Sequence, residues 1–204
     1  MRIQRRARAS AHSRELKSDI AAAAALKGVS GRVCGAACAK RCDRCGGVGC
    51  QCACSPYCLD APRALSIEPL VYPIEPAVTP LVYEMTRSGV FHPCWSCEGH
   101  LGSDGAIQKM PRVWFYCDSL VHVRLLANGL TRLRHGGRLS VDWRIAVTYS
   151  DHDNPETTFS LEPCPGESEA PSLDALQRDL GEIARALHDL VREEARALAS
   201  MAAL

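Results

Sequence analysis

A cluster of cysteines constrains this chain more than any other feature of its sequence. Eight of the 12 cysteines fall within 25 residues, which are otherwise rich in glycine and small side chains and show no apolar period of helix or strand. Such a stretch has too few apolar side chains to build a core, so it needs a metal ion or cross-links to fold. The eight residues are Cys34, Cys38, Cys42, Cys45, Cys50, Cys52, Cys54 and Cys58.

The cellular compartment decides how clustered thiols are interpreted. The basic start of the chain is followed by an apolar run, residues 21–26, that is too short for an export signal and comes after Glu15 and Asp19. No stretch approaches the roughly 20 apolar residues that cross a bilayer. We therefore expect a cytoplasmic protein without membrane contact, although the Arg, Ser and Ala content leaves an organelle transit peptide open. In the cytoplasm, clustered thiols bind metal more often than they form disulfides.

Zinc is the first expectation for the cluster. Cys42 and Cys45 enclose two residues and are followed by Gly46, the pattern of a zinc knuckle, in which glycine lets the backbone turn beneath the ion. The remaining ligands could come from Cys54 with Cys58, or from Cys34 with Cys38. Eight thiols suffice for one or two zinc ions, and an iron–sulfur cluster is the alternative cofactor.

Two short resemblances involve this cluster. Residues 42–49 fit Cys-x-x-Cys-x-Gly-x-Gly, which resembles a single zinc repeat of the DnaJ-type co-chaperones. That family uses two such repeats for an ion, and no second copy is present here. The spacing of Cys38, Cys42 and Cys45 is similar to that of the radical S-adenosylmethionine enzymes, whose barrel needs more strands than this sequence predicts.

A second concentration of reactive side chains is His92-Pro-Cys94-Trp-Ser-Cys97-Glu98-Gly99-His100. Cys94, Cys97 and His100 have the residue types and spacing of metal ligands, with His92 or Cys117 as further donors. The same thiols could form a redox pair, or Cys97 could be a nucleophile beside a His100 base. A buried turn with inert thiols is the remaining interpretation.

Patterns along the chain predict four parts: a basic segment over residues 1–33, a metal-binding module over 34–62, a Pro-rich linker over 63–78 with buried apolar anchors, and a domain over 79–204. In the last part the expected order is helix, strand, strand, helix, strand, strand, helix. This order predicts an α+β fold, a small four-stranded sheet with helices on one face. The expected helices cover residues 80–88, between Thr79 as N-cap and Gly89, and 120–135, between Ser119 as N-cap and Gly136; a third helix follows Pro171. The expected strands cover 90–92, 112–117, 139–149 and 157–161, with an exposed loop over 93–105.

Residues 79–162 resemble a group of small bacterial and phage proteins that carry a Ser-Cys-x-Gly-His loop, here Ser96 to His100. The resemblance implies the order of elements and brings no activity with it. A fainter likeness, to the Ser-Cys-x-Gly loop of the wybutosine-synthesis methyltransferase, is broken by His100, where that loop has Arg.

Charge and apolar patterns suggest possible partners. Residues 1–33 carry eight Lys or Arg against two acids, so they could contact nucleic acid, although no aromatic residues are interleaved. Leucines and Ile183 recur at intervals of three and four from Leu173 to Leu190, which favours packing in the core over a protein partner. The sequence thus predicts a zinc-binding protein, either a binding or regulatory module or, alternatively, an enzyme or redox protein that uses residues 94–100.

Overall fold

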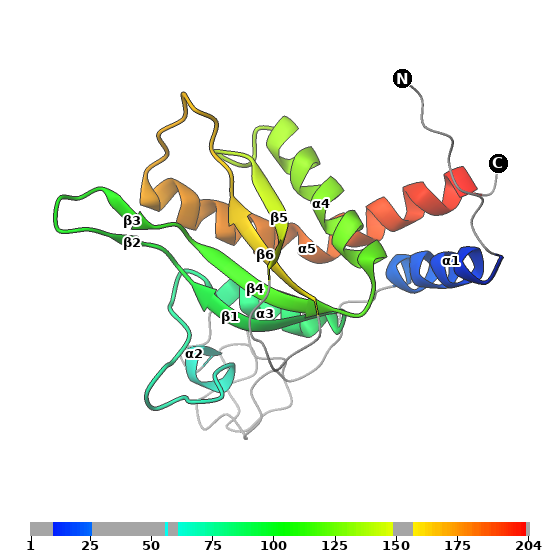
Figure 1. Ribbon diagram of the computed structural model, residues 1–204, viewed down its shortest axis with the longest axis horizontal. Coiled ribbons are helices and arrows are strands. Elements are labelled where there is room, and N and C mark those ends of the chain that lie inside the picture. Colours follow the sequence, from blue (N-terminus) through cyan, green and yellow to red (C-terminus); the bar gives the residue numbers. More distant parts are fainter. Residues whose placement is uncertain (1–9, 26–55, 57–60, 149–156, 203–204) are drawn as a thin grey trace, which may run out of the picture.

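The computed structural model describes residues 10–25, 56, 61–148 and 157–202. All eight cysteines of the cluster, Cys34 to Cys58, lie outside these residues, as does Tyr149. The described part contains five helices and six strands (Figure 1). They are α1 (Ser10–Ala24), α2 (Ala61–Ala64), α3 (Thr79–Ser88), β1 (Phe91–Cys97), β2 (His100–Leu101), β3 (Ile107–Lys109), β4 (Arg112–Cys117), α4 (Leu120–His135), β5 (Trp143–Thr148), β6 (Thr158–Pro163) and α5 (Leu173–Ala202).

A four-stranded antiparallel sheet in the order β1-β4-β6-β5 forms the centre of the fold. Alternate residues of each strand point to opposite faces, and one face carries Val113 and Phe115 of β4 beside Phe159 and Leu161 of β6. These side chains join one core with α3, α4 and α5, which lie along the same side of the sheet (Figure 1). The α+β prediction, a small sheet with helices on one face, is confirmed.

Helix α5 is the central helix of the core. Its predicted apolar seam is buried at Leu176, Leu180, Ile183, Leu187 and Leu190. The seam contacts α1, α3 and α4 of the same chain, so it packs in the core, as the pattern favoured. In the described part of the chain, no helix is both long and apolar enough to span a bilayer.

Local end signals at the predicted helices are borne out with one exception. Thr79, expected as the N-cap, is instead the first residue of α3, and its hydroxyl donates to the Glu75 carbonyl rather than capping the helix. Gly89 follows α3 with φ of 70°, a left-handed conformation that glycine adopts without steric penalty. The Ser119 side chain accepts a hydrogen bond from the Val121 amide at the start of α4, and Gly136 ends that helix. These residues explain why the bounds of both helices could be predicted closely.

Two strands differ in length from their predictions. The strand expected over residues 139–149 begins only at Trp143, because the amide and hydroxyl of Ser140 bind the Asp179 side chain instead of a neighbouring strand. The first strand, in contrast, is longer than predicted. A loop was expected from Pro93 onward, but β1 continues to Cys97 with a bulge between Pro93 and Trp95, and the chain then forms the β2/β3 hairpin. Strand β1 lies at the sheet edge, where a proline without an N–H is tolerated and a bulge absorbs the irregularity.

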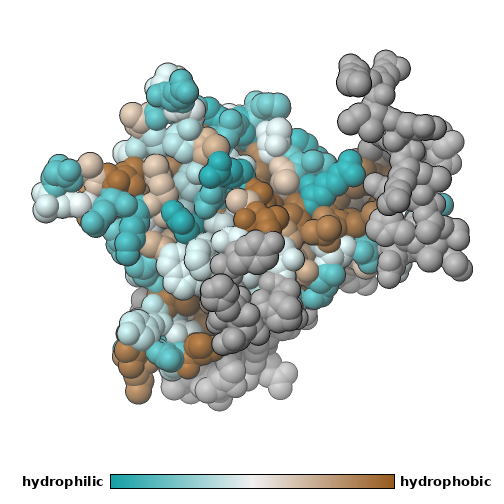
Figure 2. All heavy atoms as spheres, viewed as in Figure 1, coloured by the Kyte–Doolittle hydropathy of each residue, from teal (hydrophilic) through white to brown (hydrophobic). Residues whose placement is uncertain are grey.

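The Pro-rich linker also differs from its prediction. After the short helix α2, Leu65 and Ile74 pack partly against the core, whereas Ile67, Leu70 and Val71 are exposed. Figure 2 shows hydrophobic atoms exposed at the lower left of the molecule, where Figure 1 places α2 and the segment after it. The expectation that all the Leu, Val and Ile side chains of this segment are anchors was therefore wrong.

The basic N-terminal segment contributes a helix to the domain. Helix α1 packs against α5 and α4, with Ile20 and Ala23 buried in the contact. The hydroxyl of Ser119, at the start of α4, donates a hydrogen bond of 2.5 Å to the Asp19 carboxylate of α1. Residues 10–24 therefore belong to the folded unit and do not form a separate tail.

His122 of α4 is buried near this contact, and neither of its ring nitrogens has a hydrogen-bond partner in the described structure. Burial lowers the pKa of His122 below its ordinary 6.5, although the Asp19 and Asp118 carboxylates oppose this shift. The folded state therefore binds fewer protons than the unfolded chain as the pH falls through 6.5.

The free energy of unfolding is thus expected to decrease as the pH falls from 7 through 6.5 toward the lowered folded pKa. Urea unfolding at several pH values measures this decrease. His122→Leu should remove most of it, whereas His135→Leu, at an exposed position of the same helix, should leave it unchanged. Equal pH dependence in wild type and His122→Leu would show that other groups cause it.

Candidate metal site

A tight turn at the end of β1 brings Cys97 and His100 together. Cys97 is the last residue of β1 and His100 the first of β2, with Glu98 and Gly99 between them. Gly99 has φ of 87°, and a Cβ atom there would lie 2.6 Å from Leu173 Cδ1 and 3.0 Å from Pro111 Cδ. Only glycine fits this turn without strain, because both its backbone and its surroundings exclude a side chain.

The third member of the group, Glu75, comes from the segment before α3. Its Oε1 atom lies 2.9 Å from His100 Nε2, and its Oε2 atom accepts a hydrogen bond of 2.7 Å from the Glu98 amide. One carboxylate oxygen is thus fixed by the backbone, and the other is directed at the imidazole. Sequence patterns did not identify Glu75, which stands among the prolines of the linker, 22 residues before Cys97.

Glu98 joins the β1–β2 turn to the segment before α3 by two hydrogen bonds, one through its side chain and one through its backbone amide. Its side-chain Oε2 atom accepts a hydrogen bond of 2.7 Å from the Ala77 amide, while its own amide donates to Glu75. Its carbonyl accepts a third bond, 3.2 Å long, from Gln177 Nε2 of α5. The β1–β2 turn, the segment before α3 and the start of α5 therefore hold the site together before any ligand arrives.

Glu75, Cys97 and His100 form a group whose ligand atoms all lie within 4.8 Å of one another. Among the described residues, no other set of three or more Cys, His, Asp or Glu side chains meets this criterion. Cys97 is buried, and burial raises the pKa of its thiol, a shift that the Glu75 carboxylate increases and the Gly99 amide, Lys109 and Arg112 oppose. The free thiol is therefore held in its protonated form at neutral pH.

The other cysteines and the histidine predicted for this region lie apart from the group. Cys94 is exposed beside the bulge of β1, and burial of part of its side chain raises the pKa of its thiol. Cys117 donates to the Ser119 carbonyl, and burial raises its pKa to about 11. His92 pairs with Asp118 at 3.2 Å. The structure thus unites two of the three residues predicted as ligands here, Cys97 and His100, and adds Glu75.

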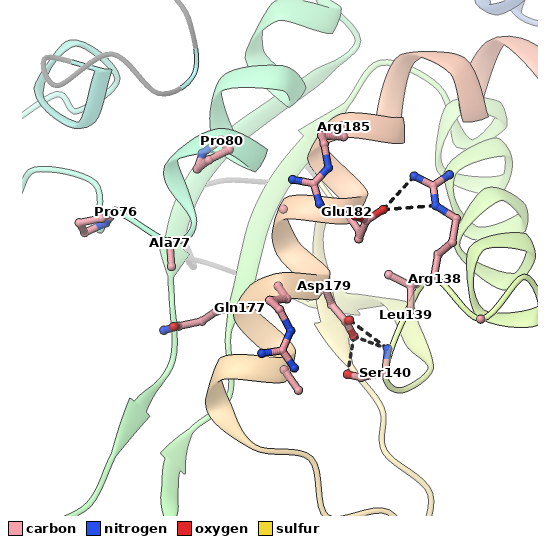
Figure 3. A pocket seen from close by; sticks show the side chains of 14 residues that line it. Pro76, Ala77, Pro80, Arg138, Leu139, Ser140, Gln177, Asp179, Glu182 and Arg185 are labelled. Atoms are coloured by element: carbon pink, nitrogen blue, oxygen red, sulfur yellow. Dashed lines mark hydrogen bonds and ion pairs between the residues drawn. The ribbon is translucent and has the colours of Figure 1, made fainter.

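Two cavities lie on either side of the segment that carries Glu75. One, of about 840 Å³, is lined by Glu75 itself together with Tyr72, Trp95 and neighbouring residues. The other, of about 850 Å³, lies between Pro76–Ala77 and α5 (Figure 3). The Glu75 side of the site therefore adjoins a space that small molecules can enter.

The second cavity has a buried carboxylate in its wall. Asp179 accepts hydrogen bonds from the backbone amide and the hydroxyl of Ser140, as Figure 3 shows, and from Trp143 Nε1 at 3.0 Å. All of its partners belong to the protein, which gives Asp179 a structural role that ties α5 to the residues before β5.

Comparison with protein-family models, with curated proteins and with solved structures finds no match to this chain.

Proposed function

We propose that this protein binds a transition metal ion, zinc above all, through Glu75, Cys97 and His100. The observation that carries the proposal is the convergence of a carboxylate, a thiol and an imidazole within 4.8 Å on a prearranged framework. These are the three side-chain types that bind zinc in proteins. The sulfur and nitrogen donors favour zinc over magnesium or calcium, which prefer oxygen ligands.

Three protein ligands leave one position of a tetrahedral ion open. Structural zinc sites use four protein ligands, whereas catalytic sites keep the fourth position for water or substrate. The arrangement of Glu75, Cys97 and His100 therefore supports a site that exchanges ligands at the metal. The eight clustered cysteines, Cys34 to Cys58, would hold one or two further zinc ions, or an iron–sulfur cluster, for a structural purpose.

The same side chains suggest a second candidate function, nucleophilic catalysis. His100 contacts Glu75 at 2.9 Å, as a general base contacts the carboxylate that orients it, and Cys97 lies beside them. The raised pKa of the buried Cys97 thiol opposes this function, since a nucleophile needs a lowered thiol pKa. The raised pKa of the thiol does not oppose metal binding, because the charge of the ion deprotonates a coordinating thiol.

The test is metal analysis of the full chain, combined with cobalt substitution to record thiolate-to-cobalt absorption. Glu75→Gln, Cys97→Ser and His100→Ala should each lose one ion per chain, with affinity falling by at least about 100-fold. Glu98→Ala removes only a positioning group and should cost about 10-fold. Cys94→Ser and His92→Ala are matched controls, because both residues lie outside the group and should keep the ion.

Two results would contradict the proposal. The first is equal metal content in wild type and Cys97→Ser. The second is rapid alkylation of Cys97 by iodoacetamide in protein saturated with zinc, since a metal-bound thiolate is protected. That second result would favour the nucleophile instead.

A further inference from the structure

The sheet face turned away from the helices carries two of the three tryptophans of the chain. Trp95 of β1 and Trp114 of β4 are directly paired, with ring centroids 5.0 Å apart and planes inclined by 44°. Trp95 is 46% exposed, whereas the third tryptophan, Trp143, is only 6% exposed in the core. Trp95 forgoes part of the burial that stabilises most such rings, whereas Trp114 is half-buried, so Trp95 in particular offers a stacking surface to a ligand with a flat face.

A positively charged side chain, Arg112, lies next to the tryptophan pair on the same sheet face. Arg112 pairs with Cys97, two residues along both strands from the tryptophan pair, a separation of about 7 Å. Arg112 acts electrostatically on Cys97 and also on the Glu162 carboxylate of β6. A partly balanced positive charge therefore lies beside the tryptophan pair.

The rest of the face is polar, and of its β6 residues Thr158 and Ser160 are buried. Ser160 of β6 pairs with Trp114 on one side and Ala146 of β5 on the other, and Arg144 of β5 pairs with Glu162 of β6 at 2.8 Å. Glu162 also interacts electrostatically with Arg112, so Arg112, Arg144 and Glu162 together leave one net positive charge on this part of the face. The surface thus combines aromatic rings with a net positive charge on one side of them.

We propose that this face binds single-stranded nucleic acid, with bases stacked on Trp95 and Trp114 and a backbone phosphate held by Arg112. Every base has a flat face that stacks on an aromatic ring, and arginine and lysine bind the phosphates between bases. A duplex would present only its backbone, because its bases already stack on one another. Binding here does not depend on the proposed metal, since neither tryptophan nor Arg112 belongs to the ligand group.

The experiment measures fluorescence anisotropy of labelled single-stranded DNA and RNA, about 12 nucleotides long, on titration with the full chain. Trp95→Ala should weaken binding by about 5- to 100-fold, and Trp114→Phe, which keeps a smaller ring, should weaken it less. Arg112→Ala should lower the slope of log affinity against log salt by about 0.7. Leu120→Ala and Arg124→Ala change an exposed apolar residue and an exposed cation of α4, and should bind as wild type does.

Circular dichroism establishes that each variant is folded, and zinc titration of Trp95→Ala separates this inference from the metal proposal. The inference is overturned if wild type fails to bind at low salt, or if it binds duplex as tightly as single strands. It is also overturned if Trp95→Ala binds unchanged, which would place the contact in the basic N-terminal residues. Saturable quenching of tryptophan fluorescence by oligosaccharides but not by oligonucleotides would assign the face to carbohydrate.

Discussion

Asp179→Ala is expected to lower the free energy of unfolding by about 2–4 kcal/mol. The buried carboxylate accepts hydrogen bonds from Ser140 and from Trp143 Nε1, and the alanine variant would leave these donors without acceptors. Each unsatisfied buried donor costs about 1–3 kcal/mol, less where water can reach it. Against a total stability of about 5–15 kcal/mol, this loss is large enough to appear in urea unfolding curves.

Glu182→Ala is the matched control, one turn further along α5. Glu182 pairs with Arg138 at 2.8 Å and with Arg185, and these exposed ion pairs should contribute less than about 1 kcal/mol. If both variants lost equal stability, the buried position of Asp179 would not be the reason for its effect.

Gly99→Ala is expected to destabilise the fold by about 3 kcal/mol and to abolish zinc binding at Glu75, Cys97 and His100. The left-handed backbone accounts for about 1–2 kcal/mol of this loss, and the rest comes from the contacts of the new Cβ with Leu173 and Pro111. Relief of these contacts must move the turn, and with it the angle between the thiol and the imidazole. Urea unfolding and zinc titration measure the two effects.

Gly105→Ala separates backbone strain from crowding. Gly105 has φ of 76° in the β2/β3 hairpin, and a Cβ there would have no atom within 4 Å. This variant should lose only about 1–2 kcal/mol and should keep the ion. Retained zinc affinity in Gly99→Ala would mean that the turn does not set the ligand geometry.

Most of the fold could be predicted because its signals are local. The bounds predicted for the strand over residues 112–117 and the helix over 120–135 agree with the structure, since a run of β-forming side chains and the caps Ser119 and Gly136 mark them. The full length of β1 could not be predicted, because Pro93 and the glycines after it favour a loop. Pairing with β4 overrides that local preference, and no local pattern reports on such a partner.

The candidate metal site, like the fold, has one part that local sequence signals predict and another part that they do not. Cys97 and His100 are close in sequence, so their residue types and spacing indicate metal ligation. Glu75 joins them only because β1 packs beside α3, and the hydrogen bonds that orient it involve the backbone amide of Glu98 and the side chain of that residue. Amide donors are the same in every residue except proline, so no sequence pattern identifies them. Cys94 matched the expected spacing, but the bulge in β1 leaves it exposed and outside the group.

The packing of α1 against α5 changes the topology that the linear order of segments suggests. Helix α1 packs in the domain core, and so does Ala61 of α2. The cysteine-rich segment therefore connects two elements of the same folded unit. The entropic cost of closing such a loop grows only with the logarithm of its length, about 0.6 kcal/mol for each doubling. Insertions of very different length are therefore compatible with an unchanged domain.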